Sequence, residues 1–407
     1  MRTLGITSAA WLVATITLAG NPCAHAEAAV QVGPRPAYLI HQLAPGPLRT
    51  QLERCLDEPI RRSRFSIAHR GAPLQFPEHT RESYLAAARM GAGVIECDVT
   101  FTKDRQLVCR HDQCDLHATT NILSIPSLAA KCSAAFTPFD PATGTPASAR
   151  CCTSDLSLAE FRQLRGKMDG VDPQARTVEA FMQGTPTWRT DLYASTGTLM
   201  THREAIALFQ QLGVAMTPEL KTPVVEMPFA GDYSQDDFAE QMLDDYVAAG
   251  IDPSQVRAQT FRIDDIQHWQ RSHPAFAERA IALFDLADLP AAEQLRHRLP
   301  ALKQQGIRTL APPLWALLRS DEHGALHASP LAIEARQQGF ELITWTLERS
   351  GTLQDDNDYY LQGLGNAING PGDVWRLLAA LDQQVGVTGV FSDWPATTSF
   401  YASCLHR

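Results

Sequence analysis

The segment from Ile67 to Asp112 brings together residue types that can bind an ion and move protons. Five residues of these types lie there on or beside short apolar runs, namely His69, Arg70, Glu96, Asp98 and His111. Such polar side chains are costly in an apolar core unless they converge on an ion or a substrate. Glu96 and Asp98 are two residues apart in an apolar run, so in a strand they would point to one face. This pattern predicts a site for a hard cation.

A second pair of charged residues lies further along the chain, at Glu219 and Lys221. These two side chains would also share one face of a strand. Glu96, Asp98 and Glu219 could together hold one Ca²⁺ or Mg²⁺ through oxygen ligands. Such an ion polarises a phosphoryl oxygen and can orient or acidify an attacking hydroxyl or water. We therefore expect one divalent cation, Ca²⁺ or Mg²⁺, as the cofactor.

The other residues of this set suit the cleavage of a phosphodiester. Arg70 and Lys221 would neutralise the non-bridging oxygens, the arginine through its planar fork. His69 and His111 could supply a base and an acid, because imidazole titrates near neutral pH. The pattern leaves open which histidine is the base.

Eight short apolar or β-branched runs are predicted to be strands, and most of them are followed by a helical pattern. They span residues 66–69, 94–99, 215–221, 256–261, 280–284, 309–311, 342–347 and 389–393. Strands that alternate with helices imply a parallel sheet, and eight such units predict an α/β fold of the (β/α)₈ TIM-barrel type. The alternative, an open doubly wound sheet, would have a glycine-rich phosphate loop after its first strand. No such loop is present, so we favour the barrel.

The polar residues coincide with the carboxyl ends of these runs, where TIM barrels place their active sites. The residues at these ends are His69, Arg70, Glu96, Asp98, Glu219, Lys221, Gln259, Trp345 and Asp393. A single one of them, such as Trp345, could be explained by packing. Their coincidence at equivalent ends is better explained by a shared site.

A long segment without a clean βα unit, at about residues 113–200, interrupts the predicted barrel after its second strand. Before it, the polar turn TKDRQ joins the second strand to a short run around Val108, so these two runs should form a hairpin. The segment has one helical stretch at 158–164 and four cysteines. We expect an ordered, cross-linked insertion over one mouth of the barrel. The later stretch QDDNDYYLQGLGNAING is predicted to be surface.

The cysteine content is typical of an exported protein. Nine cysteines are present, and eight remain once Cys23 is removed with the predicted signal peptide. An even number in an exported chain predicts disulfides. Cys55 and Cys404 could join the two ends of the mature chain. Cys97, between two carboxylates, is expected to pack as a small buried apolar residue.

The N-terminal sequence predicts export to the periplasm or the medium. Residues 1–26 combine an early arginine, an apolar stretch and AHA before Glu27, as in a cleaved signal peptide. Residues 27–64 are interpreted as an arm and 65–407 as the barrel. No later stretch has about 18 consecutive apolar residues, so no transmembrane segment is expected in the mature chain. A net charge of -10 without a Lys/Arg-rich run argues against a nucleic-acid partner.

The motifs HRG…PEHT, ECD…HD, PELK and TWT, with the terminal FSDWP, make the chain resemble the glycerophosphodiester phosphodiesterase family. The resemblance covers about residues 66–395 and implies a (β/α)₈ barrel. It also implies hydrolysis of small glycerophosphodiesters to an alcohol and sn-glycerol 3-phosphate, with Ca²⁺ or Mg²⁺. The resemblance implies that His69 and His111 are the acid/base pair and that Glu96, Asp98 and Glu219 are the metal ligands. It also implies that Arg70 and Lys221 contact the phosphate and that Trp345 forms an apolar wall for the alcohol.

Two features depart from the family pattern. His79 stands where the family usually has Asn; because it precedes a predicted helix cap, we expect it to tune the structure without changing the reaction. The cysteine-bearing insertion is longer than in compact members of the family. It could select the substrate or be surface decoration.

Two alternatives to this function remain open. A phospholipase-D-like or phosphatidylinositol-cleaving enzyme on the same barrel would also use two histidines and a cation, but it would act on membrane lipids. A catalytically silent binding protein would keep the fold and tolerate the loss of an acid, base or ligand. Every expected position is occupied in this chain, which favours an enzyme.

Overall fold

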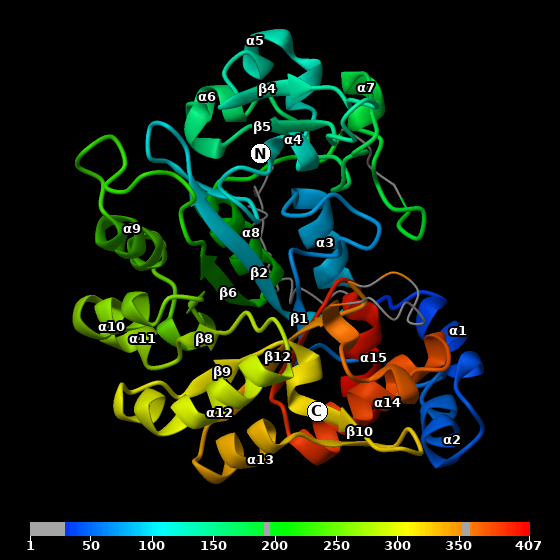
Figure 1. The fold of residues 1–407 in the computed structure, drawn as a ribbon. Coiled ribbons are helices and arrows are strands. Elements are labelled where there is room, and N and C mark those ends of the chain that lie inside the picture. The colour runs from blue at the N-terminus through cyan, green and yellow to red at the C-terminus, as the bar shows by residue number, and fades with distance from the viewer. Residues whose placement is uncertain (1–28, 191–195, 350, 352–358) are drawn as a thin grey trace, which may run out of the picture.

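A computed structural model describes residues 29–190, 196–349, 351 and 359–407. Eight parallel strands close into a barrel (Figure 1), because β1 pairs with both β13 and β2. The barrel strands are β1 (Ser63–Ala68), β2 (Ala92–Phe101), β6 (Ala215–Leu220), β7 (Gln259–Thr260), β8 (Ile281–Leu283), β9 (Thr309–Ala311), β12 (Glu341–Leu347) and β13 (Gly389–Ser392). All eight predicted strands are therefore present, with ends that differ by a few residues. The predicted signal peptide lies outside the described residues.

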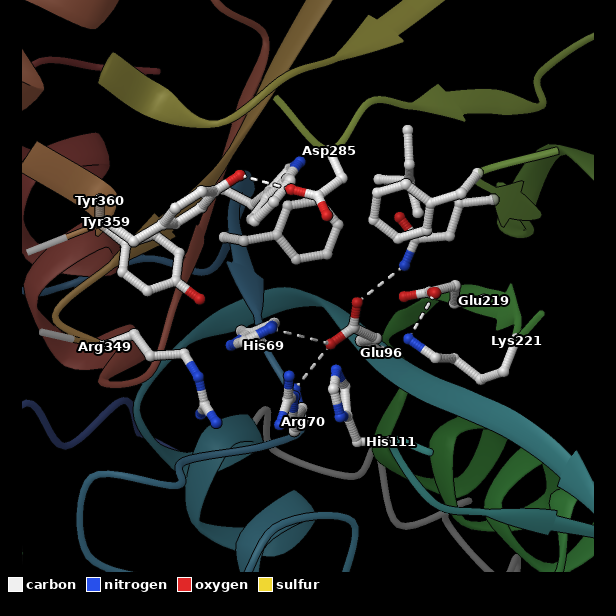
Figure 2. A pocket seen from close by; sticks show the side chains of 15 residues that line it. His69, Arg70, Glu96, His111, Glu219, Lys221, Asp285, Arg349, Tyr359 and Tyr360 are labelled. Carbon is white, nitrogen blue, oxygen red and sulfur yellow. Dashed lines mark hydrogen bonds and ion pairs between the residues drawn. The ribbon is translucent and has the colours of Figure 1, made fainter. Parts of the chain in front are cut away.

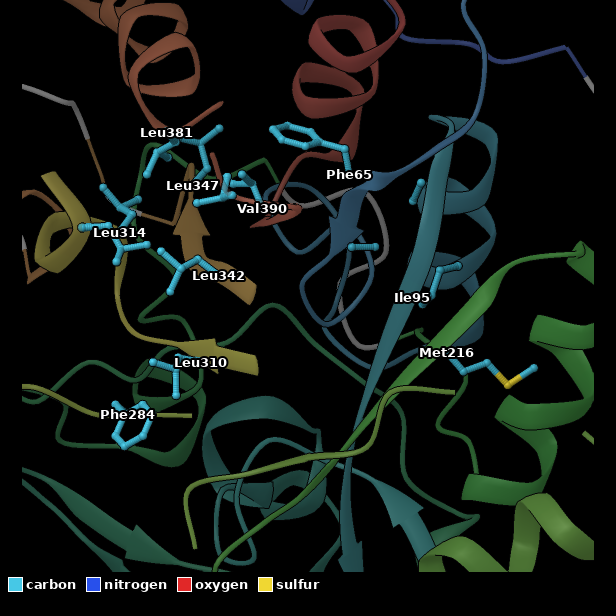
Figure 3. Close-up of a cluster of buried hydrophobic side chains, with 14 of the residues drawn as sticks. Phe65, Ile95, Met216, Phe284, Leu310, Leu314, Leu342, Leu347, Leu381 and Val390 are labelled. Carbon is cyan, nitrogen blue, oxygen red and sulfur yellow. The ribbon is translucent and has the colours of Figure 1, made fainter. Parts of the chain in front are cut away.

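The barrel strands are apolar on both faces, as expected of parallel strands that are covered by helices. Inward-facing side chains such as Ile67, Val94 and Phe391 form one small core inside the barrel. Side chains on the other face, including Ile95 and Val390, belong to a larger core beneath the helices, to which Phe65 in the irregular first part of β1 also contributes (Figure 3). In β2 and β13, the alternation of side chains therefore directs neighbouring residues, such as Val94 and Ile95, into different cores.

Helices separate most of the strands and surround the barrel (Figure 1). They include α3 (Arg81–Arg89), α8 (His202–Leu212), α9 (Gln235–Ala248), α10 (Ile263–Ser272), α12 (Leu289–Gln304), α13 (Pro330–Gln337), α14 (Val374–Ala379) and α15 (Pro395–Cys404). Side-chain caps define several of their starts. Thr80 accepts a hydrogen bond from Ser83 N, and Thr201 and Glu204 form a capping box. These caps fix where each helix leaves the loop that precedes it.

The segment between β2 and α8 departs from the βα pattern. β3 (Leu107–Cys109) pairs antiparallel with β2 and forms the predicted hairpin. Beyond it, short helices and the two-stranded sheet of β4 (Ala134–Thr137) and β5 (Ser148–Arg150) enclose a separate apolar cluster. Two disulfides, Cys114–Cys152 and Cys132–Cys151, cross-link this part of the chain. Figure 1 shows α5 (Pro126–Ala129), β4, β5, α6 (Leu158–Phe161) and α7 (Val178–Phe181) together on one side of the molecule.

Two further disulfides connect parts of the barrel. The predicted bridge between Cys55 and Cys404 joins the end of α2 (Pro47–Arg54) to the end of α15. The prediction for Cys97 was wrong, because this residue is bonded to Cys109. The hairpin brings β3 alongside β2 and leaves the two Cα atoms 5.3 Å apart, which suits a disulfide.

The first described helix, α1 (Arg35–Gln42), packs with α2 against α14 and α15 (Figure 1). Their apolar residues Leu39, Ile40 and Leu52 are buried in the larger core. Within the described residues, no helix has both the length and the apolar character needed to cross a bilayer.

Candidate active site

A cavity of about 430 Å³ lies at the carboxyl ends of the barrel strands. Seven of the predicted site residues line it, namely His69, Arg70, Glu96, His111, Glu219, Lys221 and Trp345. The eighth, Asp98, is buried and offers an oxygen within 4.8 Å of oxygens of Glu96 and Glu219. The structure therefore brings together the eight candidate residues, and Figure 2 labels His69, Arg70, Glu96, His111, Glu219 and Lys221 around the cavity.

The three carboxylates are held together by the pairing of two adjacent strands. Asp98 in β2 lies opposite Glu219 in β6, and Glu96 precedes Asp98 on the same face. Burial, together with the neighbouring Asp98 and Glu219, raises the pKa of Glu96 well above its usual value. Burial also raises the pKa of Glu219 to about 7, against the opposing effect of Lys221. Carboxylates so crowded ionise more easily when a cation lies among them.

Neighbouring side chains orient the carboxylates but leave oxygens available. Glu96 accepts hydrogen bonds from Gln259 Nε2 at 2.7 Å and from the backbone N–H of Arg70 at 2.8 Å. One oxygen of Asp98 lies 2.8 Å from His79 Nε2, while the other is buried and has no hydrogen-bond partner. The donor set of buried oxygens, one of them unpaired, fits a hard cation such as Ca²⁺ or Mg²⁺.

His79, the departure from the family pattern, is buried behind this cluster. Its Nδ1 lies 2.9 Å from the hydroxyl of Tyr84, and its Nε2 contacts Asp98. Burial lowers its pKa, although Asp98 opposes the shift. The ring therefore fixes the orientation of one carboxylate from the side away from the cavity.

The two histidines approach the carboxylates from different elements. His69 follows the end of β1, and its Nδ1 lies 2.6 Å from Asp393, the residue after β13. Its Nε2 faces the cavity, 4.0 Å from Glu96. Burial lowers the pKa of His69 to about 4, although Asp393 opposes this shift. Asp393 thus fixes the ring and leaves Nε2 free to accept a proton.

His111 reaches the cavity from the hairpin, two residues beyond β3. The neighbouring Arg110 donates its backbone N–H to the carbonyl of Asp98, which ties this part of the hairpin to β2. Burial, followed by the positive charges of Arg70 and Lys221, lowers the pKa of His111 well below its usual value. Two imidazoles therefore lie among three carboxylates and several cations.

Three cationic side chains face the cavity. Arg70 donates to the buried Glu78 at 2.8 Å, and Lys221 lies 2.6 Å from Glu219. Arg349 pairs with Asp393 at 3.0 Å and lies 3.8 Å from Glu78. Such a cluster of cations suits an anionic substrate, and Arg70 offers the fork that matches phosphate.

Several residues that line or support the cavity were missed from the sequence. Glu78 and Asp393 belong to the motifs PEHT and FSDWP but were given no role, and Arg349 carried no local signal of a site. The segment after β12 was predicted to be surface, and this prediction was wrong for Tyr359 and Tyr360. Both residues line the cavity beside Trp345, because the chain folds back over the end of its own strand. Residues 354–358 of that segment lie outside the described residues.

The segment between β3 and α8 also contacts the residues around the cavity. Asp169 lies 3.4 Å from Arg349, and Arg189 lies 3.6 Å from Asp393. Asp169 and Arg189 also contact each other. The cross-linked part of the chain is therefore joined by ion pairs to the carboxylate that orients His69.

Comparisons with known proteins indicate the family of this chain. The model of the "Glycerophosphoryl diester phosphodiesterase family" matches residues 69–397. An "Extracellular protein" of Arthroderma benhamiae is 46% identical over 244 residues, which cover 59% of this chain and 100% of that relative. The "Probable glycerophosphodiester phosphodiesterase 1" of Mycobacterium tuberculosis is 47% identical over 57 residues, 14% of this chain and 21% of the relative.

The fold is also found among solved structures. The structure of a "Putative glycerophosphoryl diester phosphodiesterase" from Silicibacter pomeroyi has a TM-score of 0.55 and 20% identity to this chain. The alignment covers 87% of this chain and 98% of the Silicibacter chain. At this identity the likeness concerns the fold alone.

Proposed function

This chain belongs to the glycerophosphoryl diester phosphodiesterase family and is an enzyme of that class, and we propose that it hydrolyses small glycerophosphodiesters to an alcohol and sn-glycerol 3-phosphate with the help of one divalent cation. A single observation carries this proposal. Two histidines, three carboxylates and the cations that suit a phosphate all converge on one cavity at the carboxyl ends of the strands.

Glu96, Asp98 and Glu219 would hold the cation. Their oxygens lie within 4.8 Å of one another, and the unpaired oxygen of Asp98 supports a ligand role. When bound, Ca²⁺ or Mg²⁺ supplies positive charge that polarises a phosphoryl oxygen. Arg70 and Lys221 would bind the non-bridging oxygens of the phosphate, and Glu78 keeps the Arg70 side chain in place.

His69 is the better base of the two histidines. The Asp393 carboxylate accepts the Nδ1–H, so the lone pair on Nε2 is directed into the cavity. His69 would accept the proton of the attacking hydroxyl or water, and His111 would give a proton to the leaving alcohol. Burial, followed by Arg70 and Lys221, lowers the pKa of His111, and the negative charge of a bound phosphate would offset these two cations.

The activity is tested by glycerol 3-phosphate release from a panel of glycerophosphodiesters with Ca²⁺, with Mg²⁺ or with a chelator. We expect release that depends on the cation and disappears with the chelator. His69→Ala and His111→Ala should each abolish turnover without unfolding the protein, whereas His297→Ala, at an exposed position on α12, should not change it. Substantial release by the His69 variant would contradict the proposed role of His69.

The same assay separates the two alternatives. Faster cleavage of phosphatidylcholine or phosphatidylinositol vesicles than of the soluble diesters would indicate a lipid-cleaving enzyme. A silent binding protein would release no product with either cation.

We also propose that the protein is exported. The four disulfides, Cys55–Cys404, Cys97–Cys109, Cys114–Cys152 and Cys132–Cys151, suit an oxidising compartment. The Arthroderma relative is described as extracellular, and residues 1–26 have the pattern of a signal peptide. Secretion or periplasmic location would be tested by fractionation of cells that express the full chain.

A further inference from the structure

Aromatic side chains form a wall along one side of the cavity. The wall consists of Phe261, Trp345, Tyr359 and Tyr360. The ring centroids of Tyr359 and Tyr360 lie 6.0 and 6.1 Å from the ring centroid of Trp345. The ring of Phe261 makes an edge-to-face contact with Trp345, with 6.1 Å between the centroids. One aromatic ring could simply cover the end of a strand. Four rings from three separate segments, all facing the same cavity, indicate a shaped subsite.

A carboxylate adjoins this aromatic wall. Asp285, two residues beyond β8, also lines the cavity and accepts a hydrogen bond from the Tyr359 hydroxyl at 2.7 Å. Figure 2 shows Asp285, Tyr359 and Tyr360 together, away from Arg70 and His111. This hydrogen bond uses only one of the two carboxylate oxygens of Asp285. This end of the cavity therefore combines π faces with the carboxylate of Asp285, while the guanidinium of Arg349 lies on the side of Tyr360.

We propose that this wall binds the quaternary ammonium group of a choline-type alcohol, so that the preferred substrate is a glycerophosphodiester of that class. The inference rests on the proposed function, because it assigns the alcohol half of the same substrate. Quaternary ammonium groups bind to aromatic cages through cation–π attraction. The carboxylate of Asp285 adds a favourable charge at the edge of the cage.

The position of the wall relative to the phosphate-binding cations fits such a substrate. The Nζ of Lys221 lies 5.9 Å from the centroid of Phe261, so the phosphate subsite borders the aromatic wall directly. In a choline-type ester two carbons separate the phosphate oxygen from the cationic nitrogen. A phosphate at Arg70 and Lys221 would therefore bring that nitrogen close to the rings.

Other alcohols suit this wall less well. A primary ammonium is strongly hydrated and needs hydrogen-bond acceptors, which the aromatic rings supply poorly. A polyol such as inositol would leave several hydroxyls against apolar surfaces without partners. A quaternary ammonium has no N–H groups to satisfy and exposes methyl groups that pack against the rings.

The proposal is tested by comparing glycerophosphocholine with its uncharged carbon isostere, the 3,3-dimethylbutyl ester, and with glycerophosphoglycerol. We expect kcat/KM to be about tenfold higher for the choline ester than for the isostere of the same shape. Tyr360→Leu and Asp285→Asn should each reduce this preference several-fold, whereas Tyr360→Phe should keep it. Tyr38→Leu, on α1 and 52% exposed, is the matched control and should leave all three rates unchanged.

A binding measurement keeps this test separate from the proposed function. In the His69→Ala protein, calorimetry with Ca²⁺ present should show tighter binding of glycerophosphocholine than of the isostere, whether or not the enzyme turns over. If no diester releases glycerol 3-phosphate, the proposed function fails. If the isostere binds and reacts as well as the choline ester, or if Tyr360→Leu lowers all rates equally, the quaternary ammonium subsite is excluded.

Discussion

His69 depends for its orientation on Asp393, a residue 324 positions away in the chain. The closure of the barrel between β13 and β1 brings the two together. Although burial opposes its ionisation, Arg349 and His69 lower the pKa of Asp393, so this carboxylate stays charged beside the ring. Without it, the imidazole could rotate or present the wrong tautomer to the cavity.

We therefore expect Asp393→Asn to lower kcat by about a hundredfold or more, with a much smaller change in KM. The amide can keep the packing, but it cannot stabilise the protonated ring. Steady-state kinetics on a soluble diester would measure the effect. Asp321→Asn, in the loop between β10 (Leu318–Ser320) and β11 (Leu326–Ala328), is the control and should match the wild type. An Asp393→Asn enzyme with unchanged kcat would show that His69 does not need this carboxylate.

At the scale of single residues, the sequence predicted the residues that are proposed to carry the chemistry better than those that support them. His69, Glu96 and Glu219 could be recognised because each is a polar residue at the end of an apolar run. Arg349 could not, because its ion pairs join it to residues far away in the chain, and Glu78, although it lies in the PEHT motif, gave no sign that it would hold Arg70. Tyr359 was missed for a related reason, since its segment reads as a polar loop and only the folded chain shows it turning back over Trp345.

Among the secondary-structure elements, the β2–β3 hairpin has the closest link to the reaction. Its first strand carries Glu96 and Asp98, and its second strand ends two residues before His111. The Cys97–Cys109 disulfide joins these strands on the face opposite the carboxylates. The sequence predicted the hairpin from its polar turn, but the pairing of the cysteines depended on which residues the hairpin places side by side.

Removal of this disulfide should affect activity as well as stability. We expect the Cys97→Ala/Cys109→Ala double variant to lose about 3 kcal/mol of unfolding free energy and to have a lower kcat, because the hairpin then holds His111 less firmly. The Cys55→Ala/Cys404→Ala double variant removes a bridge far from the cavity and is the matched comparison. It should be destabilised with little change in kcat, as measured by urea unfolding and steady-state kinetics. Equal kcat values in the two variants would contradict a positioning role for the hairpin bridge.

The opposite ends of the strands provide stability instead of chemistry. Arg257, before β7, forms a bidentate pair with Glu341 at the start of β12, with N–O distances of 2.9 and 2.7 Å. Burial opposes the ionisation of Glu341, but Arg257 and two threonine hydroxyls outweigh it and lower its pKa to about 2. The folded state therefore favours the charged carboxylate. Its stabilising effect is complete above the unfolded pKa of about 4.3 and is lost as the pH falls toward 2.

Glu341→Gln should accordingly lower the unfolding free energy at pH 7 by about 1 kcal/mol, a modest value because the Glu341 side chain is 36% exposed and screened by water. The difference from the wild type should shrink between pH 5 and pH 3, and kcat should not change. Urea unfolding at several pH values would measure it. Glu278→Gln removes a more exposed carboxylate from the same end of the barrel and should change stability less. A difference that is independent of pH would show that the Glu341 charge is not responsible.

For the molecule as a whole, the barrel could be predicted because its eight strands repeat one local pattern. The segment between β3 and α8 could be recognised only as an interruption of that pattern. Its own apolar cluster and two disulfides make it ordered, but its contacts with the barrel join residues far apart in the sequence, as in the hydrogen bond from the Thr153 hydroxyl to the carbonyl of Phe101 and the ion pair of Arg189 with Asp393. Such contacts follow from the tertiary arrangement and have no periodicity from which to predict them.

These ion pairs separate the two roles that were open for this segment, substrate selection and surface decoration. Arg189 is almost completely buried and lies 3.6 Å from Asp393, which orients His69. We expect Arg189→Ala to lower kcat/KM about tenfold, because removing a supporting contact loosens the group that it holds. Arg165→Ala, at an exposed position of the same segment, should behave as the wild type.

The comparison should be made with several diesters and with thermal unfolding as a check on the fold. A uniform loss across all substrates would mean that the segment supports His69 through Asp393. A loss that varies with the alcohol would mean that it also selects the substrate. If Arg189→Ala and Arg165→Ala are both as active as the wild type, the segment is surface decoration, and the ion pairs between it and the barrel have no part in the reaction.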